Sequence, residues 1–264
     1  MPTALIIGAS RGLGLALATQ LGNDPNYNGS TGTTFATVRS ESFDSTNLPQ
    51  SVVVIKGVDL NSPEDAGRGI AQAIQSNGIK SLDLVIINAG VFVAETLDAP
   101  KYEAEAEMYK VVAIAPVFLA HHLHKANLFS NPSKLVLITT EGGSISLRTQ
   151  EEGGGNYGHH GSKAAANMVG RLLSIDLKDS GVTVVMIHPG FMRTEMTKAV
   201  GYDKYWDAGG AVLPSEAAAS ALSFVSSVNP DQTGTFWAPR GPRDIGEAER
   251  VLGKNLPTPL QLPW

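Results

Sequence analysis

Three glycines at the spacing G-x-x-x-G-x-G are the residues of this sequence best suited to bind a phosphate group. Gly8, Gly12 and Gly14 follow an apolar run at 5–7, and a helix-like apolar pattern begins at Leu13. A strand that ends at such a turn and opens a helix forms an anion site, because its backbone can approach a pyrophosphate and free N–H groups attract the charge. The other interpretation is an ordinary strand–turn–helix corner, but the position directly after an apolar run favours a bound dinucleotide.

A second set of reactive side chains lies in segment 157–163, which reads Tyr-Gly-His-His-Gly-Ser-Lys. On a helix with about 100° between residues, His159 and Lys163 share one face. Tyr157 lies six residues before Lys163, about 240° around a regular helix, and reaches the same place only if the helix begins after it. The charge of Lys163 lowers the pKa of His159 below ~6.5, so we expect a mostly neutral imidazole that donates one hydrogen bond or acts as a base.

Two arginines indicate which dinucleotide would bind. The second apolar run ends at Val38-Arg39-Ser40, and Arg11 lies within the glycine turn. In a dinucleotide fold the end of the second strand meets the adenosine ribose, where an acidic residue bonds the 2′-hydroxyl of NAD. Two guanidinium groups at that place instead fit a 2′-phosphate, so we expect NADP(H). The alternative is a pair of solvated surface arginines.

A core of strands and helices must hold these two sets of residues in place. Several apolar runs, such as Leu84-Val85-Ile86-Ile87, show no alternation, which indicates strands buried on both faces of a mostly parallel α/β sheet. No repeat or linker divides the chain, so we expect one domain over residues 1–264. Strands are expected near 3–8, 33–38, 51–57, 82–88, 134–140, 182–188 and 234–238, and helices near 12–22, 62–77, 101–127, 158–180 and 215–228.

Composition limits the classes of protein to which the chain can belong. It has 264 residues, a net charge of −5 and no basic run, which argues against a nucleic-acid partner. It has no cysteine, which excludes disulfides and thiolate chemistry. No apolar run reaches the ~18 residues of a membrane span, and the early first strand leaves no room for a signal peptide, so we expect a cytoplasmic protein that acts on a small molecule. His121, His122 and His124 lack a carboxylate at metal spacing, so we expect a surface or packing role for them and no metal site.

Other strand ends and loops carry polar or aromatic residues. Asp59, after the third strand, can accept a hydrogen bond from an adenine amino group. After the fourth strand, Asn88 can hold the ends of the central strands together, and Ala89 and Gly90 let a cofactor pass close to the backbone. The alternative is that these residues only form turns, because turns after strands favour these residue types. Residues 23–32 form a polar surface loop. The loop at about 190–214 carries three aromatic residues, which either cover a ligand as a substrate lid or anchor the loop: Tyr202, Tyr205 and Trp206.

These motifs, in this order, resemble the short-chain dehydrogenase/reductase family over almost the whole chain. The resemblance rests on Gly8–Gly14, Asn88-Ala89-Gly90, Lys163 and Pro189-Gly190. The ending, with Gly234-Thr235-Phe236-Trp237 and Leu262-Pro263-Trp264, is similar to that of small carbonyl reductases related to C-signal and sniffer proteins. Against that subgroup, residues about 241–256 look like an insertion within a C-terminal extension at about 239–264.

The resemblance implies a doubly wound, seven-stranded Rossmann fold that binds NADP(H) at the carboxyl ends of its strands. It implies a dimer or tetramer through the two long helices. It also implies cofactor roles for named residues: Gly8, Ser10, Arg11, Leu13 and Gly14 at the pyrophosphate and adjoining ribose, Arg39 at the 2′-phosphate, Asp59 and Leu60 at the adenine, Asn88, Ala89, Gly90 and Lys163 along the ribose channel, and Pro189, Gly190, the Phe191 backbone and the Thr194 hydroxyl at the nicotinamide.

The sequence departs from the family at its chemical centre. The family uses Asn, Ser, Tyr and Lys; here the matching positions are Val112, Thr140, His159 and Lys163. A glutamate (Glu141, Glu151 or Glu152) would offset the effect of Lys163 on His159 only if it came close. We therefore expect an NADPH-dependent reductase of a small carbonyl or of an activated C=C or C=N acceptor. The alternatives are a lyase, isomerase or cyclase that uses His159 as a base, and a non-catalytic NADP(H)-binding protein.

Overall fold

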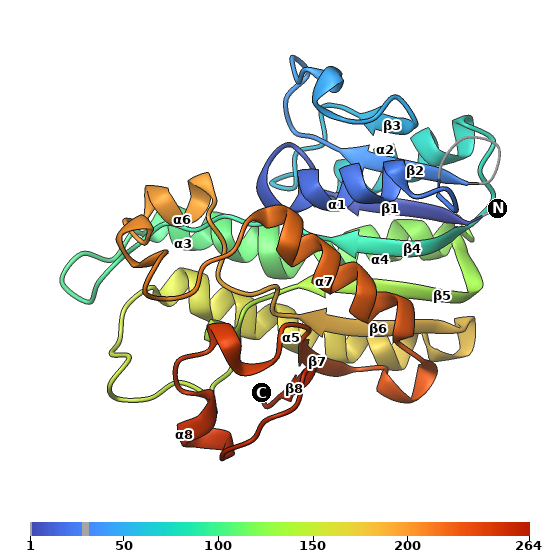
Figure 1. Ribbon diagram of the computed structural model, residues 1–264. Helices are drawn as coiled ribbons and strands as arrows, with labels where there is room; N and C mark the ends of the chain where they lie inside the picture. The colour runs from blue at the N-terminus through green and yellow to red at the C-terminus, as the bar shows by residue number, and fades with distance from the viewer. Residues whose placement is uncertain (1, 28–31) are drawn as a thin grey trace.

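The computed structural model describes residues 2–27 and 32–264, which form one twisted sheet with helices on both faces (Figure 1). Residues 28–31 of the expected polar loop lie outside the described residues. The described strands pair in the order β3-β2-β1-β4-β5-β6-β7-β8. All pairs from β3 to β7 are parallel, as expected from the unalternated apolar runs. The strands are β1 (Thr3–Ile7), β2 (Thr33–Thr37), β3 (Val52–Ile55), β4 (Leu82–Ile87), β5 (Phe129–Ile138), β6 (Val182–Ile187), β7 (Thr235–Ala238) and β8 (Leu260–Leu262).

The expectation of seven strands is wrong, because the described part of the chain forms eight. Strand β8 runs antiparallel to β7 and pairs Leu262 with Phe236 and Leu260 with Ala238. It has only three residues and lies between two prolines, so no periodic pattern of usable length marks it. Its two buried leucines close the core at this edge of the sheet.

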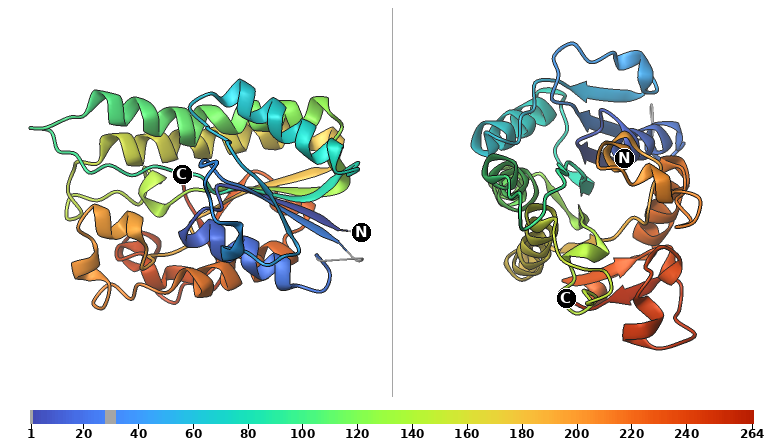
Figure 2. Two further views of the ribbon diagram at one scale, coloured as in Figure 1. Left: turned by 90° about the horizontal axis from the view of Figure 1, so that it is seen from above. Right: turned by 90° about the vertical axis from the view of Figure 1, so that its left-hand side faces the viewer.

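The helices cover the two faces of the sheet unequally. Helices α1 (Gly12–Asn23) and α7 (Pro214–Ser227) lie side by side on one face. Helices α2 (Pro63–Ser76), α3 (Tyr102–Tyr109), α4 (Ala115–Lys125) and α5 (Tyr157–Asp176) cover the other, as the view from above shows (Figure 2). Successive residues of β1 serve the two layers in turn, with Leu5 and Ile7 in one core cluster and Ala4 and Ile6 in the other.

The long helix expected at 101–127 is interrupted by a π-helical turn, η2 (Lys110–Ile114). Pro116 lacks an N–H group and therefore cannot bond to the carbonyl of Val112. The backbone N–H of Ala115 donates instead to the carbonyl of Lys110, five residues earlier. The wider turn places Val112 in the buried layer beside the carboxyl ends of the strands.

Short elements complete the carboxyl edge of the sheet. The loop after β6 contains α6 (Glu195–Ala199), and the C-terminal extension contains η7 (Gly241–Asp244) and α8 (Ala248–Leu252). Trp264 is partly exposed, and its ring stacks on the buried Phe236 with 6.0 Å between centroids. None of the helices in the described ranges combines the length and the apolar character needed to cross a bilayer.

Candidate active site

The glycine turn is packed so tightly that two of its glycines have no room for a side chain. Gly8 has a φ of +89°, and a Cβ there would lie 2.7 Å from the Cα of Ala89. A Cβ on Gly14 would overlap the carbonyl oxygen of Gly8. Asn88 Nδ2 donates to that same oxygen at 2.7 Å, so Asn88 joins the ends of β1 and β4 as the sequence predicts. The turn therefore presents bare backbone at the carboxyl edge, as a pyrophosphate site requires.

Helix α1 begins directly after this turn without a side-chain cap. Arg11 occupies the N-cap position, but its side chain makes no capping hydrogen bond, and no acidic residue lies in the first turn. Ser10 is exposed beside it, whereas Leu13 is buried and anchors the helix to the core. Within the described residues, no side chain caps the N–H groups at the start of the helix, which suits an anionic ligand.

Arg11 and Arg39 lie on neighbouring segments at this edge. The glycine turn is tied to the end of β2, because the N–H groups of Gly8 and Ala9 donate to the Oγ1 and carbonyl oxygen of Thr37 at 3.1 and 2.8 Å. Both arginines are exposed. Neither guanidinium has an ion-pair partner within the described ranges. Two free cations beside the turn fit a phosphate on the adenosine ribose.

Asp59 and Leu60, after β3, differ in exposure. Asp59 is exposed, and its Oδ1 accepts from the backbone N–H and side-chain amide of Asn61 at 3.0 and 3.1 Å. Leu60 is buried in the core. Of these two side chains, only that of Asp59 is therefore accessible to a ligand.

Lys163 is buried at the carboxyl end of the sheet, against Gly90. Its Nζ donates to the carbonyl oxygen of Ile138, the last residue of β5, at 2.7 Å. A Cβ on Gly90 would lie 3.6 Å from this Nζ and 3.9 Å from Cγ2 of Val112. Burial lowers the pKa of Lys163 to about 8. The lysine is thus fixed by the strand end and faces the segment that follows β4.

His159 lies one turn before Lys163 and is enclosed by other rings. Phe92 stacks on it with 3.9 Å between centroids, and Nδ1 of His160 lies 3.4 Å from its Nδ1. Burial, together with the charges of Lys163, His160 and Arg148, lowers the pKa of His159 to about 3. The ring is therefore neutral at pH 7, as the sequence predicts.

The sequence left open whether Glu141, Glu151 or Glu152 opposes the lowering of the His159 pKa by Lys163. None of them contributes to that pKa in the structure. Arg148 lies between Glu141 and Glu152, at 3.5 and 3.4 Å from their carboxylates, and presents its own positive charge to His159. Glu151 pairs with Arg250 at 2.7 Å. Burial raises the pKa of Glu141 to about 7, although Arg148 opposes this.

His160 follows His159 directly in α5, but its ring turns back toward that of His159. The two ring centroids lie 5.2 Å apart, and the ring of His160 lies over Gly142 in the short helix η3 (Glu141–Gly143). A Cβ on Gly142 would lie 2.5 Å from His160 Nδ1. The missing side chain at residue 142 creates the space into which the ring turns back.

Thr140 and Tyr157 occupy different positions relative to this cluster. Thr140 caps η3, and its Oγ1 accepts from the Gly142 N–H at 3.4 Å. Helix α5 begins at Tyr157, so the condition under which this residue would reach Lys163 is not met. The Tyr157 side chain is 42% exposed and leaves a different face of the helix. The structure therefore does not bring Tyr157 to the site.

The loop after β6 closes the site on the side of the glycine turn. Gly190 has a φ of +99°, and Pro189 before it is buried. Phe191 accepts from the Val212 N–H at 3.0 Å through its carbonyl. Thr194 caps α6, and its Cγ2 would lie 3.7 Å from a Cβ on Gly12. The loop and the glycine turn are thus adjacent, as one bound dinucleotide would require.

Comparison with known proteins identifies the family. The family model described as short chain dehydrogenase matches residues 2–204. The chain belongs to this family. It is 28% identical to 1-hydroxy-2-glutathionyl-2-methyl-3-butene dehydrogenase of Rhodococcus sp. (strain AD45) over 89% of this chain and 96% of the relative.

Solved structures share the fold of this short-chain dehydrogenase at lower identity. The NADPH-bound carbonyl reductase from chicken fatty liver superposes with a TM-score of 0.75 at 22% identity, covering 90% of this chain and 96% of that one. The carbonyl reductase Sniffer of D. melanogaster superposes with a TM-score of 0.74 at 20% identity, covering 100% of both chains.

The aromatic loop of this dehydrogenase is anchored to the body of the protein, while its role as a substrate lid stays a prediction. Tyr202 meets the edge of Phe92 with 5.8 Å between centroids, and its hydroxyl accepts from Asn156 Nδ2 at 3.1 Å. Trp206 anchors the loop, because its Nε1 donates to Thr197 Oγ1 at 3.2 Å. Tyr205 is half exposed. One aromatic residue therefore reaches the site and another holds the loop.

The sequence reasoning missed two residues that shape this site. Phe92 covers His159, and Glu95 fixes the start of α5. Glu95 is 5% exposed; its Oε1 accepts from the Gly158 N–H at 2.6 Å, and its carbonyl accepts from the Asn156 N–H at 3.0 Å. Both residues lie in an irregular segment after β4, where no periodicity or motif signals a role.

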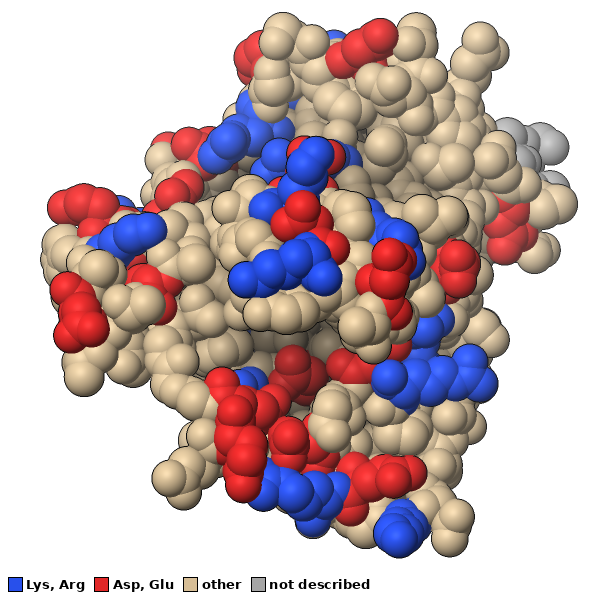
Figure 3. All heavy atoms as spheres, turned by 60° about the vertical axis from the view of Figure 1, so that its left-hand side comes forward, with Lys and Arg blue, Asp and Glu red and all other residues tan. Residues whose placement is uncertain are grey.

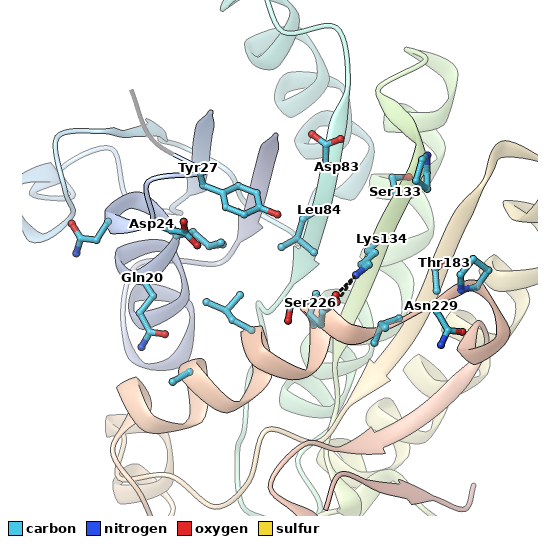
Figure 4. Close-up of a pocket in the computed structure, with 18 residues that line it drawn as sticks. Gln20, Asp24, Tyr27, Asp83, Leu84, Ser133, Lys134, Thr183, Ser226 and Asn229 are labelled. Atoms are coloured by element: carbon cyan, nitrogen blue, oxygen red, sulfur yellow. Dashed lines mark hydrogen bonds between the residues drawn. The ribbon is translucent and has the colours of Figure 1, made fainter. Parts of the chain in front are cut away.

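The surface of the dehydrogenase is hollowed at more than one place. The face turned forward in Figure 3 carries acidic and basic groups intermingled around a recess near its centre. A groove of about 900 Å³ lies elsewhere, between α1, α7 and the starts of β4 and β5 (Figure 4). Lys134 in this groove donates to the carbonyls of Val225 and Ser226 at 2.6 and 3.1 Å, so its ammonium group is engaged in closing α7. The reactive groups His159 and Lys163 are not part of this groove.

Of the three histidines of α4, His122 packs against α2, whereas His121 and His124 are exposed. His122 Nε2 lies 3.0 Å from a carboxylate oxygen of Glu64 on α2, and its ring fills the space above Gly67. No three histidine, aspartate or glutamate side chains in the described part of the chain converge as metal ligands would.

Proposed function

We propose that this short-chain dehydrogenase is an NADPH-dependent reductase in which His159 takes the place of the family's tyrosine. The observation that carries the proposal is the placement of His159 one helical turn from the buried Lys163, which faces Gly90 at the edge where the glycine turn lies. A proton-donating ring, a lysine and a dinucleotide cradle at one edge are the parts that such a reduction requires.

The residues present fit NADP(H). Gly8 and Gly14 would approach the pyrophosphate, and Arg11 and Arg39 would pair with the 2′-phosphate. Lys163 would contact the nicotinamide ribose. A solved relative, the carbonyl reductase from chicken fatty liver, is described as NADPH-bound, which supports this choice. When bound, NADPH would supply the hydride.

The protein groups around the substrate would control its orientation and its proton. His159 Nδ1 is occupied by His160, which leaves Nε2 as the ring nitrogen available to a substrate oxygen or nitrogen. The Thr140 hydroxyl would donate a second hydrogen bond. Phe92 and Tyr202 would form an apolar wall that excludes water.

The substrate class follows from the weak acidity of a neutral imidazole. A plain ketone needs full protonation of its oxygen, whereas enones, quinone-like rings and imines or iminium ions are already activated for hydride transfer. We therefore propose small carbonyl compounds and activated C=C or C=N acceptors as substrates, with the activated acceptors reduced faster.

The test is consumption of NADPH, followed by its absorbance, against simple ketones, enones, quinones and cyclic imines. We expect turnover with at least one activated class, a slower reaction with NADH, and identification of the reduced product by mass spectrometry. Substrate conversion without loss of NADPH would instead indicate a lyase, isomerase or cyclase. Tight NADPH binding without any conversion would indicate a binding protein.

We also propose that the chain assembles into a homodimer or homotetramer through α4 and α5. Three apolar side chains on α5 are more than half exposed: Met168, Leu172 and Ile175. Val117 on α4 is 43% exposed. Light scattering after gel filtration should show a multimer that Leu172→Glu dissociates, and a monomeric native chain would contradict the proposal.

A further inference from the structure

His159 and His160 face each other through the same ring nitrogen. Their Nδ1 atoms are 3.4 Å apart, with the ring planes at 66°. A neutral imidazole carries one N–H, so only one of these two nitrogens holds a proton in a hydrogen bond between them. The pair therefore has two arrangements, which differ in the group that His159 offers at its other nitrogen.

The two arrangements give His159 opposite chemistry. If His159 Nδ1 donates, its Nε2 is bare and can only accept a proton. If His160 Nδ1 donates, His159 carries its proton on Nε2 and can give it to a substrate. The neighbour in the chain thus decides whether His159 is an acid or a base.

The surroundings prevent His159 from storing a proton as a cation. Lys163, one turn later, and Arg148 both present positive charge to His159, and Arg148 does so to His160 as well. Burial and these charges lower the pKa of His159 to about 3 and that of His160 to about 4. A proton that leaves His159 must then be replaced in the same event, because neither ring holds a spare one at pH 7.

The position of His160 is built into the fold. Its backbone N–H donates to the Asn156 carbonyl at 2.9 Å, and its ring occupies the space over Gly142 that a side chain would fill. Arg148 is held beyond it by Glu141 and Glu152, at 3.5 and 3.4 Å. Arg148 is therefore the charge that acts on His160, and the residue remains partly exposed to solvent.

We propose that His160 is a proton-relay residue whose Nδ1–H donates to His159 Nδ1, so that His159 presents Nε2–H to the substrate and is resupplied through Nδ1. This inference rests on the proposed function, in which His159 contacts the substrate. His160 itself acts through His159 and touches no reacting atom.

The relay moves three protons and leaves both rings uncharged. Bound NADPH would supply a hydride to the substrate carbon, and the electron pair of the broken C=O π bond would remain on the substrate oxygen. That oxygen takes the proton from His159 Nε2. The proton on His160 Nδ1 moves to His159 Nδ1, and a proton from water moves to His160 Nε2. Both rings stay neutral and exchange tautomers. After the product leaves, the same protons move in reverse, with solvent restoring His159 Nε2–H.

The first test reads the tautomers directly, without cofactor. Nitrogen-15 NMR of the imidazoles should show His159 protonated at Nε2 and His160 at Nδ1, with neither ring titrating above about pH 5. His159 protonated at Nδ1 would overturn the proposal, and so would titration of either ring near its ordinary pKa.

The second test separates a relay from a merely structural role by kinetics. His160→Asn keeps an amide donor near the place of Nδ1 but cannot pass a proton, whereas His160→Phe removes the donor as well. We expect both to lower kcat by about 10²-fold, the lower end for a lost general acid, with NADPH affinity unchanged. The solvent isotope dependence of kcat should be curved in the native enzyme, which moves several protons together, and linear in His160→Asn.

The outcomes distinguish this inference from the proposed function. Native kcat in both His160 variants, while His159→Phe is impaired, would overturn the relay and leave the reductase intact. Absence of NADPH turnover in the native protein would overturn the proposed function, and the NMR result would then show whether the tautomer assignment survives it.

Discussion

Phe92 lies flat against His159, with ring centroids 3.9 Å apart and planes inclined by 20°. The two residues come from different elements, since Phe92 follows β4 and His159 lies in the first turn of α5. The stack holds the imidazole in the orientation in which its Nδ1 meets His160.

Phe92→Leu should lower kcat by about 2- to 10-fold, because it removes a ring stack worth ~0.5–1.5 kcal/mol while keeping an apolar side chain. The measurement is steady-state turnover with the best acceptor. Tyr102→Leu, on a ring that is 80% exposed, is the matched control and should leave kcat unchanged. Equal kcat in the two variants would show that the stack does not orient His159.

Arg39→Asp should reverse the preference for NADP(H) over NAD(H). The change replaces a cation that pairs with the 2′-phosphate by an anion that repels it, and we expect a loss of about 10- to 100-fold in NADPH affinity. Calorimetry with both cofactors measures this. Arg243→Asp, at an exposed arginine of the C-terminal extension, makes the same change in net charge and should have no effect. Tighter native binding of NAD(H) would refute the cofactor assignment.

His159→Phe should reduce turnover by about 10²- to 10⁴-fold with cofactor binding intact, because the ring bulk remains and the proton donor is lost. His159→Tyr installs a phenol on the same helical face and should favour simple ketones relative to enones and imines. Rates with both substrate classes, with calorimetry of NADPH, measure these effects. A fully active His159→Phe enzyme would show that the histidine only fills space.

His188 should make the fold less stable in acid. Burial lowers its pKa to about 4, with Arg240 adding to the shift and Asp244 opposing it. Between about pH 6.5 and 4 the unfolded chain therefore binds more protons at this residue than the native chain, so the free energy of unfolding falls as pH falls, by ~1.4 kcal/mol per pH unit.

His188→Asn keeps an acceptor near the place of Nδ1, which takes a hydrogen bond from the Glu141 N–H at 3.1 Å, but cannot be protonated. Urea unfolding of both proteins at about pH 6.5 and 5 should show that the native chain loses roughly 1.5 kcal/mol more on acidification than the variant. The lowered pKa values of His159 and His160 also reduce the free energy of unfolding as pH falls, whereas the raised pKa of Glu141 increases it. All three residues are present in both proteins, so their effects cancel in the comparison. Equal losses of unfolding free energy in the two proteins would contradict the assignment of this pH dependence to His188.

The sequence by itself determined the parts that depend on short stretches of chain. The glycine turn, the unalternated parallel strands and the shared face of His159 and Lys163 all follow from local spacing and periodicity. Strand β8 did not follow, because three residues between prolines carry no period.

Only the tertiary structure decided what surrounds His159. Phe92 and Glu95 arrive from an irregular segment more than sixty residues earlier in the chain, and Arg148 comes from the loop after η3. The direction of the His160 ring depends on the space above Gly142, which α5 and η3 create only when they pack together. Side-chain direction and loop path result from such long-range packing, whereas helical spacing fixes only the face from which a side chain leaves.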